Sequence, residues 1–177
     1  MGSGALPTLP RVPLVIRPLT TDDDLASFGR IVLKSYEALP GQPDDPIYFA
    51  ELVDVRHRVE TDVVLGAFDG DTPLGCVTYV NDPSSPHAEL LEDDEASFRM
   101  LAVDVAAQGR GIGDALSTAC LDRAKQNGRG AVFIYSGDWM TGAHRIYGRL
   151  GFVRVPSRDR PLPNVDGVLL AFRLALS

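Results

Sequence analysis

The 177-residue chain has few cysteines, no long apolar run and no excess of basic residues. Its two cysteines, Cys76 and Cys120, lie far apart and form no CxxC pair, so we expect free thiols in a cytoplasmic chain. The apolar runs fall short of the roughly 20 residues that a membrane-spanning helix needs. The first residues lack the basic stretch and apolar run of a secretory signal. The composition therefore predicts no contact with a membrane.

Acidic residues outnumber basic ones by 24 to 17, which gives a formal net charge of -7. Phosphate backbones are bound by a surplus of Lys and Arg on one face, so nucleic acid is a poor partner. Five of the seven residues from Glu89 to Glu95 are acidic. They form either a solvated loop or a mouth that attracts a cationic amine. No Cys, His or Asp cluster has metal-ligand spacing, so no metal is expected.

The order of elements predicts one α/β domain with a mixed, mostly antiparallel, twisted sheet flanked by helices. Residues 1–13 are rich in Gly and Pro and are expected to be a flexible segment, and residues 14–177 form the domain. Thr20 or Thr21 is expected to cap the first helix, with Asp22–Asp24 in its first turn. Strands are expected at 14–17, 63–68, 74–80, 98–103, 131–135, 152–155 and 168–174, and helices at about 22–39, 47–60, 112–126 and 141–150.

The most informative segment is a strand that runs into a glycine-rich turn and then a helix. The turn has the sequence QGRGIG from Gln108 to Gly113. Glycine is a poor helix former, and its presence there indicates that a ligand approaches the backbone closely. Free N–H groups and the positive end of the helix dipole favour a phosphate, and Arg110 adds a charged donor. The dinucleotide pattern GxGxxG fails because Asp114 or Leu116 occupies the place of its third glycine, and the phosphate-loop pattern GK[ST] is missing.

The turn fits [Q/R]-x-x-G-x-G and resembles the pyrophosphate motif of the GNAT (GCN5-related) N-acetyltransferase superfamily, which binds acyl-CoA. The preceding segment RMLAVDVAAQGRGIG is similar to the fourth strand of that family and its turn. Residues 143–152 resemble the second family signature, A-x-x-x-Y-x-x-x-G-F, which places a tyrosine at Tyr147. The two motifs cover about residues 97–155. The resemblance implies a GNAT-like fold whose sheet is splayed between strands four and five.

The resemblance also implies acetyl-CoA as co-substrate and the residues that hold it. The strand backbone near Leu101 and Val103 is expected to pair with the pantetheine arm as another strand would. Met140 replaces an Asn that hydrogen-bonds the pantetheine in many family members, so backbone groups must supply part of the binding. Trp139 beside it either lines the pocket or belongs to the core. The pyrophosphate residues implied are Gln108, Gly109, Arg110, Gly111, Gly113 and Asp114.

Two residues are candidates for catalysis. The resemblance implies Tyr147 as the acid that protonates the departing thiolate, with packing beside the cofactor as the alternative. Some family members use a strand-four Glu as the base, but the matching residue here is Ser97, which cannot be one. Glu95 lies two residues earlier on the same side of a continuing strand, so it is the candidate base, directly or through a water. Its alternative is a solvated loop acid.

These features predict an N-acetyltransferase that moves an acetyl group from acetyl-CoA to a primary amine by direct attack. Three alternatives stay open: another acyl-CoA donor, an acyl-CoA-binding sensor without turnover, and a structural or interaction domain. Ser97 and Met140 favour the sensor. The acceptor, a small-molecule or peptide amine, is expected to contact the first two helices and residues 156–167. A homodimer is an expectation from the family alone.

Overall fold

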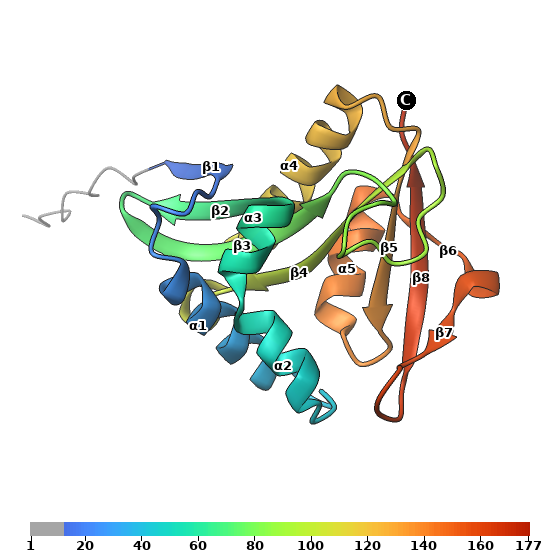
Figure 1. The fold of residues 1–177 in the computed structure, drawn as a ribbon, viewed down its shortest axis with the longest axis horizontal. Coiled ribbons are helices and arrows are strands. Elements are labelled where there is room, and N and C mark those ends of the chain that lie inside the picture. The colour runs from blue at the N-terminus through green and yellow to red at the C-terminus, as the bar shows by residue number, and fades with distance from the viewer. Residues whose placement is uncertain (1–12) are drawn as a thin grey trace, which may run out of the picture.

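The computed structural model describes residues 13–177, so the predicted flexible segment 1–13 lies, except for Pro13, outside the described residues. Within them the strands form one sheet in the order β1-β2-β3-β4-β5-β8-β6, with β7 also paired to β8 (Figure 1). Only β4 and β5 pair in parallel, which confirms the mixed, mostly antiparallel sheet. The strands are β1 (Leu14–Pro18), β2 (Val63–Asp69), β3 (Thr72–Val80), β4 (Glu95–Val103), β5 (Ala131–Gly137), β6 (Val153–Arg154), β7 (Arg160–Pro161) and β8 (Val168–Ala175).

Helices cover both faces of the sheet and bury a separate apolar cluster on each. Side chains alternate along the strands, so Phe98 packs with α4 and α5 while Met100 packs with α1 to α3. This layering confirms the predicted α/β fold. The helices are α1 (Leu25–Glu37), α2 (Pro46–Val53), α3 (Val55–Thr61), α4 (Ile112–Gln126) and α5 (Thr141–Leu150). None of the helices in residues 13–177 is long and apolar enough to cross a membrane.

The first two helical segments differ from the sequence-based expectation. α1 begins at Leu25, because Asp24 is the N-cap and its carboxylate accepts from the Ser27 N–H. Asp23 precedes the helix and pairs with Arg17 at 2.6 Å. The acids therefore lie before the helix and not in its first turn.

The single helix expected over residues 47–60 is two helices. Asp54 interrupts it, because its carboxylate accepts from the His57 N–H at 3.0 Å and caps α3. Asp45 caps α2 in the same way, with Oδ1 3.1 Å from the backbone nitrogens of Ile47 and Tyr48. These caps fix the α2 side of the site.

The sheet opens between β4 and β5. These strands pair only at Glu95 with Ala131 and at Ala96 with Val132. Beyond that point β4 runs across the view of Figure 1 while β5 and β8 stand nearly upright. The splay implied by the family resemblance is therefore present.

A β-bulge lies in β4 next to this opening. Met100 has a φ of 54°, in the left-handed region that few side chains adopt. The β3 partners pass from Cys76 opposite Ala102 to Thr78 opposite Arg99, so Met100 and Leu101 share one position across β3. The bulge turns β4 away from β5 at the opening.

Candidate active site

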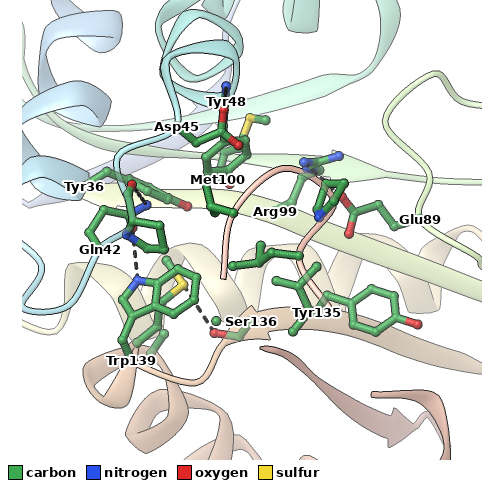
Figure 2. A pocket seen from close by; sticks show the side chains of 18 of the residues that line it. Tyr36, Gln42, Asp45, Tyr48, Glu89, Arg99, Met100, Tyr135, Ser136 and Trp139 are labelled. Carbon is green, nitrogen blue, oxygen red and sulfur yellow. Dashed lines mark hydrogen bonds and ion pairs between the residues drawn. The ribbon is translucent and has the colours of Figure 1, made fainter. Parts of the chain in front are cut away.

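A cavity of about 200 Å³ lies in the opening between β4 and β5 (Figure 2). Its walls come from α1, α2, β4, β5, α5 and residues 160–169, so both predicted acceptor segments contribute. Three of the predicted site residues line the cavity: Leu101 on the bulge, Met140 before α5 and Tyr147 on α5. The opening of the sheet and the predicted catalytic tyrosine thus meet in one pocket.

Tyr147 is buried and forms part of the wall of this pocket. Its ring packs against Phe98, Phe152 and Phe172, with centroids 6.0, 5.7 and 5.5 Å away. Burial raises the pKa of the phenol well above its usual range, and a hydrogen bond with Ser136 opposes part of that rise. The hydroxyl is therefore protonated at neutral pH, as an acid catalyst requires.

The segment between β5 and α5 forms one end of the pocket. Trp139 Nε1 donates to Gln42 Oε1 at 3.1 Å and joins this segment to the loop after α1 (Figure 2). Ser136 Oγ lies 3.5 Å from the Met140 sulfur and 3.2 Å from His144 Nε2. The structure thus places Trp139 in the pocket wall, where the sequence left the choice open.

The glycine turn at the start of α4 leaves space beside its backbone. Gly109 and Gly111 have φ values of 77° and 78°, and a Cβ added at either would meet no protein atom within 4 Å. Gly113 differs, because its added Cβ would lie 2.9 Å from Cδ1 of Ile146 on α5. Among residues 13–177 no protein group accepts from the backbone N–H groups of residues 111–113. This open turn with free donors fits a diphosphate.

Most side chains of the turn are held by the protein itself. Asp114 forms two hydrogen bonds with Arg149 of α5, at 3.0 and 2.8 Å, which lower the pKa of its carboxyl group. Arg110 lies 3.3 Å from Asp69 at the end of β2. Gln108 donates to the Val103 carbonyl at 3.4 Å. The backbone is therefore the main free donor surface of the turn, with Asp114 positioned towards α5.

Glu95 lies outside the cavity lining, in a buried cluster with two arginines. Its side chain is 0% exposed and does not line the cavity. Arg158 donates to both carboxylate oxygens at 2.9 and 3.1 Å, and Arg173 donates at 2.9 Å. Burial raises the pKa of Glu95, but these bonds and the Glu92 N–H outweigh it, so the net pKa is lowered. This position corrects the expectation of a solvated loop acid. The role of Glu95 as a base stays a prediction, which its arginine partners disfavour.

Two more acids of the segment 89–95, Glu92 and Asp94, also lie near arginines. Glu92 lies 3.7 Å from Arg158, and Asp94 lies 3.8 Å from Arg173. The segment therefore neutralises basic side chains of the C-terminal strands and the turn before β7. Of this segment Glu89 alone lines the cavity, so the mouth that attracts a cationic amine stays a prediction.

The ion pairs that Glu89 forms inside the pocket were not predicted from the sequence. Glu89, in the β3–β4 connection, lies beside Arg99 of β4 (Figure 2). It is 3.1 Å from Arg99 and 3.1 Å from Arg160 of β7. The alternation of β4 could have placed Arg99 on the face opposite Phe98. No local pattern indicates that Arg160 joins it, because β7 reaches the site only through its pairing with β8.

The described residues show neither a metal cluster nor a disulfide. No group of three or more His, Cys, Asp or Glu side chains in residues 13–177 has a metal-binding arrangement. Cys76 and Cys120 are buried free thiols, and burial raises the pKa of Cys76 to about 11. Neither cysteine is suited to act as a nucleophile.

Comparisons with known proteins agree with this geometry. The model of the acetyltransferase (GNAT) family matches residues 26–152, which is more than half of the chain. Mycothiol acetyltransferase from Rhodococcus erythropolis (strain PR4 / NBRC 100887) is 38% identical over 87 residues, which cover 49% of this chain and 27% of that protein. The chain thus spans well under half the length of that relative.

Solved structures share the fold at low sequence identity. A GCN5-related N-acetyltransferase from Kribbella flavida has a TM-score of 0.67 at 24% identity, over 92% of this chain and 98% of that one. The paia N-acetyltransferase from Thermoplasma acidophilum, in complex with coenzyme A, has a TM-score of 0.71 at 15% identity, over 93% and 99% of the chains. The yncA protein from Salmonella typhimurium, with its cofactor acetyl-CoA, has a TM-score of 0.65 at 17% identity, over 93% and 94%.

Proposed function

Because this chain belongs to the acetyltransferase (GNAT) family, we propose that it transfers an acetyl group from acetyl-CoA to a primary amine by direct attack. The observation that carries the proposal is the opening of the sheet. β4 and β5 separate after two residue pairs, and the space between them is a cavity lined by the buried Tyr147. This cavity offers space for an acyl thioester next to the Tyr147 phenol, which can donate a proton.

The residues present fit the cofactor on two counts. The turn from Gln108 to Gly113 offers free backbone donors and open space for the diphosphate, with Arg110 at its edge. The facing edges of β4 and β5 offer backbone groups near Leu101 and Val103 to the amides of the pantetheine arm. Met140 then contributes contact area and no strong hydrogen bond.

The chain's own groups would serve the reaction as follows. Acetyl-CoA, when bound, supplies the acetyl group as a thioester. A backbone N–H at the bulge near Leu101 would donate to the acetyl carbonyl and stabilise the charge that develops when the amine attacks. The Tyr147 phenol would give its proton to the leaving sulfur. Its pKa is raised by burial, but the same burial disfavours a free thiolate, so the two shifts oppose each other.

The bonds of Glu95 to Arg158 and Arg173, and its place outside the cavity lining, disfavour it as the group that removes the amine proton. Among the described residues, the carboxylates that line the cavity are Asp45, Glu51 and Glu89. Asp45 is committed to capping α2, so a water or one of the other two would take the proton.

Release of free CoA thiol, measured with acetyl-CoA and a panel of amine classes, tests the proposal, and melting temperatures are measured alongside. We expect stabilisation by acetyl-CoA, because a ligand that binds only the native state stabilises it by mass action, and turnover with at least one amine. Stabilisation without turnover of any amine would indicate an acyl-CoA-binding sensor. No shift at millimolar acetyl-CoA would indicate a structural domain. Faster turnover of a longer acyl-CoA would identify another donor.

A further inference from the structure

Two arginines on opposite sides of the opening hold one carboxylate inside the pocket. Arg99 belongs to β4, and Arg160 belongs to β7 on the far side of β8. Arg99 Nη2 lies 3.1 Å from Oε1 of Glu89, and Arg160 Nη2 lies 3.1 Å from Oε2. Each guanidinium takes one oxygen of the same group. Arg99 and Arg160 together, called the arginine clamp below, thus form a carboxylate-binding pair.

The clamp faces the cavity and is charged. Both arginines line the pocket, and their side chains are 18% and 31% exposed. Burial lowers the pKa of Arg99. The electrostatic effects of groups around Arg99, with Glu89 the largest, outweigh burial and raise the net pKa. The Arg160 guanidinium lies 4.8 Å from the Tyr135 ring centroid, which orients it. Its Nε–H is buried without an acceptor among residues 13–177, so a hydrogen-bond donor is left over.

Glu89 is easier to displace from its arginine partners than Glu95 is. It lies in the connection between β3 and β4, outside any helix or strand, and its side chain is 30% exposed. Glu95, in contrast, is fully buried and accepts from three groups of the fold. The Glu89 carboxylate can therefore leave the clamp without breaking regular structure, and a carboxylate of another molecule can take its two partners.

The other carboxylates of the pocket do not give the site a preference for cationic ligands. Asp45 Oδ1 accepts from two backbone N–H groups at the start of α2, and Oδ2 accepts from Asn164 at 3.3 Å. Glu51 lies at the rim, 43% exposed and 3.9 Å from Arg99. Once Glu89 moves aside, the strongest unpaired charge inside the pocket is positive.

We propose that the arginine clamp binds a carboxylate of the acceptor, which takes the place of Glu89. The acceptor is then a primary amine that also carries a carboxylate, such as an amino acid or a short peptide. This inference rests on the transferase function proposed above and names the acceptor class of the same site. Glu89 acts as an internal stand-in that keeps both guanidiniums neutralised while no acceptor is bound.

The test uses matched acceptor pairs, each amine as the free carboxylate and as the carboxamide, with kcat/KM measured at saturating acetyl-CoA. We expect the wild-type protein to favour the carboxylate by about tenfold to a hundredfold, the range of a charge-assisted hydrogen bond. Arg160→Gln and Arg99→Gln are each expected to lower this ratio towards one. Glu89→Gln is expected to raise it, because the internal competitor is weakened.

Glu92→Gln is the matched control, since Glu92 lies in the same connection but pairs with Arg158 outside the cavity. It is expected to leave the ratio unchanged. A wild-type ratio near one, a ratio kept by both arginine variants, or a ratio lowered by Glu89→Gln would each overturn the inference. The last result would show that Glu89 does not compete with the carboxylate of the acceptor for the arginine clamp.

Failure of the clamp is separated from failure of the transferase function by a binding measurement. The same acceptor pairs are added to the protein saturated with CoA, and the melting temperature is recorded. Greater stabilisation by the carboxylate member, lost in Arg160→Gln, supports the clamp even if no amine is turned over. Equal stabilisation by both members overturns the clamp and leaves turnover of acetyl-CoA as a separate result.

Discussion

The Tyr147 hydroxyl can be tested separately from its ring. The ring belongs to the aromatic cluster with Phe98, Phe152 and Phe172, whereas the hydroxyl faces the cavity side shared with Ser136. Tyr147→Phe keeps the packing and removes the proton. We expect kcat to fall by about 10²–10⁴-fold, the usual contribution of a positioned acid, with the acetyl-CoA dissociation constant nearly unchanged.

The control for Tyr147→Phe removes the hydroxyl of a tyrosine outside the cavity. The Tyr79 hydroxyl bonds to Asn81 and Asn127 and does not line the cavity, so Tyr79→Phe is expected to keep kcat. Wild-type turnover in Tyr147→Phe, with chemistry limiting the rate, would reduce Tyr147 to a packing role.

Gly111 and Gly128 allow the ligand role of the turn to be separated from backbone strain. Both have positive φ, 78° and 70°, and an added Cβ at either meets nothing within 4 Å. Gly111→Val and Gly128→Val should each lose about 1–2 kcal/mol of stability, because a side chain is strained in that conformation. Only Gly111→Val is expected to abolish acetyl-CoA binding in a calorimetric titration. Equal binding by the two variants would contradict the placement of the diphosphate.

At the scale of elements, Glu95 joins the first half of the sheet to the second. It begins β4, and its carboxylate is bonded to Arg158 before β7 and to Arg173 on β8. Glu95→Gln should lower the free energy of unfolding by about 2–4 kcal/mol, because two guanidiniums lose their buried counter-charge but keep some contact with water. Denaturant melts measure this loss, and kcat of the folded variant should be kept. A collapse of kcat would restore Glu95 as the base.

The contribution of Glu95 should also depend on pH. Its folded pKa lies below the usual 4.5, so its stabilisation is complete above that value and is lost as the pH falls through the folded pKa. The gap between wild type and Glu95→Gln should therefore close in acid. Glu92→Gln, which removes an exposed carboxylate near the same Arg158, is expected to change stability by less than about 0.5 kcal/mol.

For the molecule as a whole, the features that the sequence predicted are those contained in one continuous segment. The strand, glycine turn and start of α4 follow one another, and the helix with Tyr147 carries its own signature. These features depend on local backbone geometry, so a short sequence motif was enough to locate them. The start of β4 was expected at Phe98 and lies at Glu95, because residues 95 and 96 are ordered by pairing with β5.

The features that escaped prediction depend on contacts between distant segments. Glu95 looked like an exposed acid because both its arginine partners come from the end of the chain. The arginine clamp unites β4, the connection before it and β7, and no spacing in the sequence links those segments. Side-chain roles of this kind follow from the closed fold and not from periodicity.

The opening between β4 and β5 gives the sheet two inner edges in addition to its outer ones. Past Ala96 and Val132 these strands no longer pair with each other, and bare strand edges are templates on which other chains add. A pantetheine arm lying between them would cap both edges at once, as a donated strand does in a pilus subunit. Shortage of acetyl-CoA would then leave the edges open to neighbouring copies, so the solubility of this protein, as well as its rate, would follow the acetyl-CoA supply.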